Sequence, residues 1–139
     1  MSNFEQFMKK NKIKVENIQY PATASLRDED GKPLLWELRA ITTKERNKIS
    51  EECARFIGLE NGETEQKLDS EKFLSKLAAA SVVYPNLRDR ELQDSYGVMT
   101  PEDLILEMID SAEEFDNLIK TIKNHWKVDI GKEIEEAKN

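Results

Sequence analysis

LLWELRAITTKERNKISEEC, residues 34–53, joins a strand pattern to the start of a helix and therefore decides the fold class. A capping box of the form S/T-x-x-E follows the strand pattern at Thr42 and Glu45 and predicts that a helix begins there. Every second residue from 34 to 40 is apolar, and Glu37 and Arg39 lie on the opposite side, as in a strand with one buried face. The apolar set is Leu34, Trp36, Leu38 and Ala40.

Upstream of this stretch, a polar loop separates the strand from a second extended segment. Asp30-Gly31 within the loop is a hairpin signal. Pro21 has no N–H to donate to a ladder, so the first strand is predicted to lie at a sheet edge. Residues 17–41 are thus predicted to form a two-stranded antiparallel hairpin, whose apolar face must lie on helices because a lone hairpin is not stable in water.

Downstream, the apolar residues recur at helical spacing. The first predicted helix carries Ile49, Cys53, Phe56 and Ile57 and stops at Gly58, followed by a polar linker. A second helix is predicted from Asp69 or Ser70 to Pro85, with an apolar face formed by Phe73, Leu74, Leu77, Ala78, Ser81 and Val82.

Three further helices are predicted in the remainder of the chain. A short one runs over 89–96 and closes at Gly97, and Thr100-Pro101 caps the next. Ser111 and Glu114 form another capping box before the last helix. Its amphipathic stripe comprises Phe115, Leu118, Ile119, Ile122 and Trp126.

The predicted architecture is α+β and mostly α-helical, with the N-terminal antiparallel β-hairpin packed on a bundle of four to five helices. The 139 residues suit one domain. Within it we expect a short N-terminal helix or arm over 1–12, the hairpin over 17–41, a helical part over 42–126 and a charged C-terminal tail over 127–139.

Charge and composition exclude several classes of protein. A net charge of −7 disfavours binding to a nucleic-acid backbone or an anionic membrane surface. No apolar run approaches the roughly 20 residues that cross a bilayer, and the first ten residues lack the apolar core of a signal peptide. The single cysteine excludes an internal disulfide. These features predict a reduced, acidic, cytoplasmic protein.

Residues that could carry chemistry are few. The only histidine, His125, ends an amphipathic helix, and Cys53 lies on the apolar stripe of its helix, where a small buried hydrophobe is expected. The sequence DEDGK at 28–32 fails as an EF-hand loop because Leu26 would occupy the first ligand position. No glycine-rich phosphate loop is present. We therefore predict no catalytic, cofactor-binding or metal-binding residue.

Two segments carry apolar side chains that suit a partner. SVVYPNLRDRELQDSYGV, residues 81–98, is either a corner between helices or a partner-binding rim. The N-terminal triplet, spaced i, i+3, i+4, docks either on its own domain or on a partner. The candidate partner-binding residues are Tyr84, Leu87 and Tyr96 on the rim and Phe4, Phe7 and Met8 at the N-terminus.

Three blocks of the sequence resemble a known family. Residues 34–53, SVVYPNLRDRELQDSYGVMTPEDLI at 81–105 and EEFDNLIKTI at 113–122 are similar to the XkdN-like tail assembly chaperones of long-tailed phages and prophages. The resemblance covers nearly the whole chain, and the block from 82 to 98 is its most specific part.

This resemblance implies a non-enzymatic role. Proteins similar to this family bind the tape measure protein before the tail forms, keep it soluble and help to recruit tail tube subunits. They act in the host cytoplasm and are absent from the mature virion. Two alternatives remain: a tail completion or connector protein retained in the virion, and a small intracellular enzyme that uses carboxylates. Whether the chain forms a homo-oligomer is left open.

Overall fold

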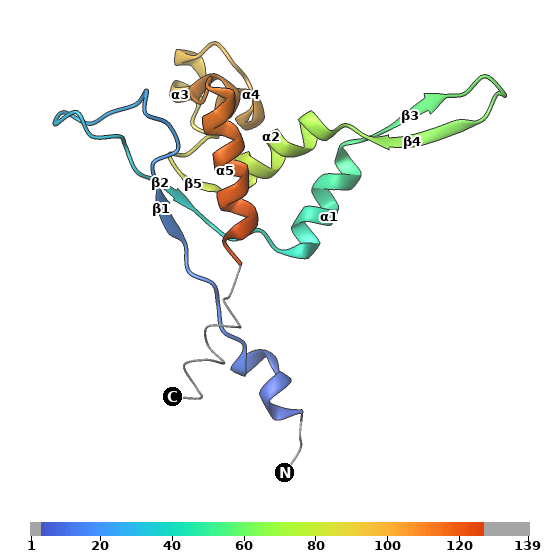
Figure 1. Cartoon of the computed structure of the whole chain (residues 1–139), viewed down its shortest axis with the longest axis horizontal. Coiled ribbons are helices and arrows are strands. Elements are labelled where there is room, and N and C mark those ends of the chain that lie inside the picture. Colours follow the sequence, from blue (N-terminus) through green and yellow to red (C-terminus); the bar gives the residue numbers. More distant parts are fainter. Residues whose placement is uncertain (1–3, 127–139) are drawn as a thin grey trace.

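Residues 4–126 are described by the structure, a computed structural model, and they form five α-helices beside a three-stranded sheet (Figure 1). A second, two-stranded sheet projects from this body. The predicted α+β, mostly helical fold is confirmed, and the predicted charged tail at 127–139 lies outside the described residues. The helices are α1 Thr43–Glu52, α2 Ser70–Ser81, α3 Arg90–Ser95, α4 Pro101–Met108 and α5 Ala112–Asn124, and two 3-10 turns, η1 Glu5–Phe7 and η2 Lys9–Asn11, precede the sheet.

The three-stranded sheet has β2 (Trp36–Leu38) at its centre, with β1 (Ile18–Tyr20) and β5 (Val82–Tyr84) antiparallel on either side. The predicted pairing of the first two strands is confirmed, and β1 lies at the edge, as Pro21 indicates. The strands are shorter than predicted. Leu34 lies outside β2 and is exposed, so the apolar alternation of residues 34–40 overstated the buried face.

The third strand, β5, corrects the predicted second helix. That helix ends at Ser81 and does not continue to Pro85, because Val82 and Val83 are β-branched and favour extended backbone. The helix gives way to the strand at Ser81, which bonds to Arg39 twice. The Ser81 Oγ donates to the carbonyl of Arg39 at 2.8 Å, and the Ser81 carbonyl accepts from the Arg39 N–H at 2.8 Å. The hairpin thereby gains a strand from the middle of the chain.

A second correction concerns residues 54–68, predicted as the end of a helix and a polar linker. They form β3 (Ala54–Gly58) and β4 (Thr64–Leu68), paired in register from Ala54 opposite Leu68 to Gly58 opposite Thr64. Asn61-Gly62 supplies the turn, and Gly62 has φ +85°, which non-glycine residues rarely adopt. We refer to residues 54–68 as the ribbon.

The predicted helix caps are largely confirmed. The Thr42–Glu45 capping box is complete, and Thr100 caps α4 with Pro101 at its first turn. Ser111 accepts from the Glu114 N–H, but the Glu114 carboxylate does not return to the cap. It accepts instead from the Thr23 hydroxyl and the Ala24 N–H, both at 2.7 Å, and ties α5 to the loop that follows β1.

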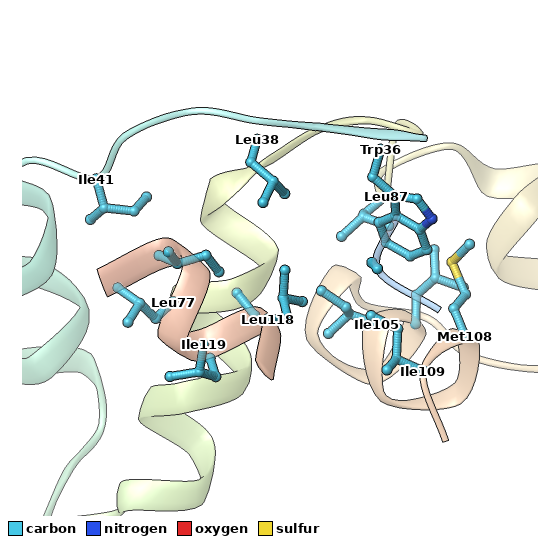
Figure 2. Packing of buried hydrophobic residues seen from close by; sticks show 14 residues of the cluster. Trp36, Leu38, Ile41, Leu77, Leu87, Ile105, Met108, Ile109, Leu118 and Ile119 are labelled. Carbon is cyan, nitrogen blue, oxygen red and sulfur yellow. The ribbon is translucent and has the colours of Figure 1, made fainter. Parts of the chain in front are cut away.

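The core fills the space between the sheet and helices α2, α4 and α5 (Figure 2). Trp36 and Leu38 point from β2 toward the helices and are almost fully buried. Burial of such side chains stabilises a fold by about 1.5–3 kcal/mol each. The helical members of the core are Leu77, Ala78, Leu104, Ile105, Met108, Leu118, Ile119 and Ile122.

Candidate functional site

A groove of about 710 Å³ lies where the start of α1, the middle of α2 and the end of α5 meet. Its apolar side chains come from the chain segment before α1, from α2, and from the end of α5 together with Trp126, which follows that helix. Four cationic side chains surround this apolar part. We call this site the basic groove; its apolar residues are Ile41, Phe73, Leu77, Ile122 and Trp126, its cations are Lys12, Lys44, Arg46 and Lys123, and Thr42 and Thr43 complete it.

Hydrogen bonds hold the C-terminal end of α5 in place beside the groove. The Trp126 indole N–H donates to the carbonyl of Ile41 at 2.6 Å, and the indole stays 42% exposed. The adjacent His125 places Nε2 2.6 Å from the carbonyl of Glu16. Trp126 therefore presents a fixed aromatic surface to the groove, with its polar atom already satisfied.

An ion pair fixes the start of α1, which supplies two of the cations. Glu45 accepts from both terminal nitrogens of Arg39, at 3.0 and 2.5 Å, and also closes the helix cap at Thr42. The Arg39 hydrogen bond lowers the pKa of Glu45 to about 2, with a further contribution from Thr42. The first turns of α1, with Lys44 and Arg46, are therefore held against the strand that leads into them.

The basic groove is positive although the whole chain carries a net charge of −7. No Asp or Glu is among its described lining residues. None of its four cations forms an ion pair within residues 4–126. An apolar floor with an unpaired cationic rim suits an apolar segment that carries carboxylates.

The ribbon is the second unusual surface of the chain. It extends away from the helices, and within residues 4–126 its strands pair only with each other (Figure 1). The register places Ala54, Phe56 and Leu68 on one face, and Phe56 is 73% exposed. A lone hairpin is marginally stable in water, so this apolar face is suited to packing against another molecule.

The structure separates the three predicted rim residues. Tyr84 is 66% exposed at the end of β5, whereas Leu87 is only 3% exposed and belongs to the core. Tyr96 is half-buried and packs against the same core. The inclusion of Leu87 in a partner-binding rim was wrong, because the chain turns after Pro85 and directs this side chain inward (Figure 2).

The N-terminal candidates lie on the two 3-10 turns and share an exposed position. Phe7 is 86% exposed, and Phe4 and Met8 are also mostly exposed. The segment forms two 3-10 turns in place of a continuous α-helix, since its hydrogen bonds join residues three apart, such as Met8 N–H to the carbonyl of Glu5. These three residues remain candidates for contact with a partner.

Cys53 and His125, the two residues considered for chemistry, are both held within the fold. Cys53 is buried beneath the start of the ribbon, and burial raises the pKa of its thiol, which disfavours the reactive thiolate. His125 is engaged with Glu16, as described above. Among residues 4–126, no group of three or more His, Cys, Asp or Glu side chains is placed to hold a metal ion. None of the helices in that range combines the length and apolarity needed to span a membrane.

Sequence reasoning missed the basic groove because four distant segments build it. The apolar stripe of α5 was recognised up to Trp126, but the pattern along one helix does not reveal which part of the stripe stays open. The ribbon was missed for another reason: Phe56 and Ile57 fit the apolar periodicity of a helix as well as that of a strand. Asn61-Gly62, a strong hairpin signal, is the feature that could have identified it.

Comparisons with known proteins agree with one another. The model of the family described as phage XkdN-like tail assembly chaperone protein matches residues 4–138. The chain is 28% identical over 135 residues to the phage-like element PBSX protein XkdN of Bacillus subtilis (strain 168), covering 96% of this chain and 91% of that protein. It is 26% identical over 132 residues to the uncharacterized protein YqbN of the same organism, covering 94% and 89%. A crystal structure of the protein YqbN superposes with a TM-score of 0.72 at 21% identity, over 93% of this chain and 99% of that one, and supports the fold.

Proposed function

This chain belongs to the XkdN-like family of phage tail assembly chaperones, and we propose that it binds the tape measure protein, keeps it soluble and helps to recruit tail tube subunits. It does this without catalysis, in the cytoplasm of the bacterial host, and is not retained in the mature virion. The match of the family model to residues 4–138 is the observation that carries the proposal.

The surface of the chain supports a binding role of this kind. A chaperone for a long helical protein must cover apolar side chains of its client until assembly. Exposed apolar groups that could do so occur at Phe4, Phe7 and Met8, and at Tyr84 beside the sheet. The acidic composition of the chain favours solubility of a complex that contains an aggregation-prone client.

Co-expression tests the proposal. The tape measure protein encoded with this chain is expressed alone, with the chain, and with an unrelated acidic helical protein of similar size. We expect the tape measure protein to be soluble and to co-purify only with the chain. Equal solubility in all three cultures, with no co-purification, contradicts the proposal.

Surface variants then test the contact residues. We expect Phe7→Ala combined with Tyr84→Ala to reduce the co-purified tape measure protein at least about fivefold, since exposed aromatic side chains dominate such interfaces. Met99→Ala is the matched control, because Met99 is 90% exposed and belongs to neither surface. An equal loss with the control variant, or no loss with the double variant, removes these residues from the contact.

A further inference from the structure

The chain leaves α5 at the edge of the basic groove. Trp126, which follows α5, lines the groove, and its indole N–H donates to the carbonyl of Ile41 at 2.6 Å. The neighbouring His125 places Nε2 2.6 Å from the carbonyl of Glu16. Two contacts to distant parts of the chain thus fix the point from which residues 127–139 continue. That segment is covalently joined to Trp126 and therefore begins at the groove.

The segment that begins there has a composition opposite to that of the groove. Its sequence is KVDIGKEIEEAKN, and residues 128–136 contain four carboxylates and a single lysine, interspersed with apolar side chains. The carboxylates are those of Asp129, Glu133, Glu135 and Glu136, and the apolar side chains are Val128, Ile130 and Ile134. An apolar segment that carries carboxylates is the kind of ligand that an apolar floor with a cationic rim binds.

The groove lacks a partner of this kind within residues 4–126. Its four cations form no ion pair there, and Arg46 donates to the neutral amide oxygen of Asn47. Phe73 is half-buried and Trp126 is 42% exposed, so both keep aromatic surface available on the floor. The positive charge and the apolar surface of the groove are therefore both uncompensated in the described part of the chain.

The segment is long enough to reach the cations on α1. Arg46 follows Ile41 by five residues, so its Cα atom lies within about 19 Å of that of Ile41, to which Trp126 is bonded. Residues 128–136 span up to about 30 Å when extended. The groove volume of about 710 Å³ lies within the range of about 300–1,000 Å³ that is usual for ligand clefts, so several side chains fit.

We propose that residues 128–136 fold back over the basic groove of their own copy. Their carboxylates pair with the cations of the rim, and Ile130 and Ile134 cover the aromatic floor formed by Phe73 and Trp126. Because the segment is tethered at the groove, its effective concentration there is on the order of millimolar or more. This inference goes beyond the proposed function, since it concerns the chain in the absence of any partner.

The segment thereby regulates access to the groove. Any other ligand with the same chemistry, on a second copy or on a client, must displace it before it can bind. The affinity of such a ligand for the groove is reduced by the fraction of copies in which the segment is docked. Because ions screen exposed charges, high salt weakens the docking of the segment.

Paramagnetic relaxation in the dilute full chain tests the contact. A spin label is attached through Ala137→Cys, and Cys53 does not compete for the label because it is buried. We expect the label to broaden the amide signals of Thr43 and Phe73, which lie on two different walls of the groove. A label attached through Glu29→Cys is the control, since the loop before β2 that contains this residue lies on the opposite side of the molecule from α1 (Figure 1).

Two outcomes of this experiment overturn the proposal. The first is that the label at position 137 leaves both amide signals unchanged. The second is that an equal mixture of labelled copies without nitrogen-15 and unlabelled copies with nitrogen-15 shows the same broadening, which places the segment on another copy.

Charge reversal tests the pairing with the rim. We expect Lys44→Glu with Arg46→Glu to reduce the relaxation enhancement from position 137 at least about fivefold. Adding Glu133→Lys with Glu135→Lys to that variant should restore the enhancement, because the charges are then opposite again. As a control, Lys32→Glu with Lys48→Glu makes the same change in net charge at exposed positions outside the groove and is expected to have no effect. An enhancement that survives reversal of the rim charges contradicts the proposal.

A peptide of residues 127–139 measures whether the groove is covered. Its binding to the unaltered full chain and to Ile130→Asp with Ile134→Asp is followed by fluorescence anisotropy of a dye on the peptide. We expect the variant to bind the peptide at least about tenfold more tightly, because its own segment no longer occupies the groove. Equal affinity of the two chains for the peptide shows that the segment does not cover the groove, and the proposal is then wrong.

Discussion

At the scale of single residues, Glu45 links the strand, the cap of α1 and the position of the groove cations. Its pKa is lowered from 4.5 to about 2, chiefly by the hydrogen bond from Arg39. A carboxylate whose pKa is lower in the folded than in the unfolded state stabilises the fold above the unfolded pKa, and this contribution is lost as the pH falls toward the folded pKa. The relevant window therefore lies between about pH 4.5 and pH 2.

We expect Glu45→Gln to lower the free energy of unfolding at pH 7 by about 1 kcal/mol or less, because Arg39 and Glu45 are about one third exposed and water screens the pair. Glutamine still serves at the third position of a capping box, so the variant isolates the charge. Urea denaturation at several pH values measures the effect. A difference between the variant and the unaltered chain that persists at pH 2 contradicts this account.

Glu114 makes a longer connection, from α5 to the loop after β1. Its bonds from the Ala24 N–H and the Thr23 hydroxyl lower the pKa of the carboxyl group. We expect Glu114→Ala to lower the melting temperature clearly more than Glu113→Ala, since Glu113 is an exposed residue in the same first turn. Equal melting temperatures for the two variants, measured by circular dichroism, show that these bonds do not stabilise the fold.

Alanine substitutions at Leu87 and Tyr84 test whether the leucine packs in the core and the tyrosine lies on the surface. Leu87→Ala is expected to cost about 2–5 kcal/mol, because it opens a cavity among buried side chains. Tyr84→Ala is expected to change the free energy of unfolding by about 0.5 kcal/mol or less, as for most surface substitutions. Chemical denaturation compares the two, and a larger cost for the tyrosine than for the leucine refutes the placement of both side chains.

At the scale of elements, the ribbon and the three-stranded sheet differ in what supports them. The strand β2 has a partner on each edge and buries Trp36 and Leu38 in the core. In the described part of the chain the two strands of the ribbon pair only with each other, and β4 is exposed throughout. Local opening of the ribbon therefore requires little loss of buried apolar surface.

We expect the amide protons of β3 and β4 in dilute, monomeric protein to exchange with solvent much faster than those of β2. Gly62→Ala should accelerate exchange in the ribbon further, because φ +85° disfavours a residue with a Cβ atom by about 1–2 kcal/mol. The same substitution should leave exchange in β2 unchanged. Hydrogen exchange read by NMR checks both expectations, and slow exchange throughout the ribbon contradicts them.

The elements also show what the sequence could predict. Helices α4 and α5 were predicted because Thr100-Pro101 and Ser111 are strong local start signals and the apolar stripes are regular. The strand β5 was missed because Val82 and Val83 continue an apolar run that also suits a helix. The pairing of β5 with β2, some 45 residues earlier in the chain, depends on tertiary contacts that the periodicity of the sequence does not reveal.

At the scale of the whole molecule, the family could be predicted from the sequence and the candidate binding surfaces could not. The three resembling blocks correspond to β2 with α1, to the segment from β5 to α4, and to α5, which together surround the core. The groove requires side chains from residues 12 to 126 to be brought together. Of the six partner candidates taken from the sequence, Leu87 packs in the core, and Tyr96 is half-buried.

The composition of purified phage particles tests the central claim most directly, since a tail assembly chaperone acts before the particle is complete. Quantitative mass spectrometry compares tape measure protein complexes isolated during tail assembly with finished particles from the same culture. We expect this chain in the assembly complexes and its absence from finished particles. If the finished particles retain it in a constant ratio to the tape measure protein, it is a structural tail protein, and the chaperone account is wrong.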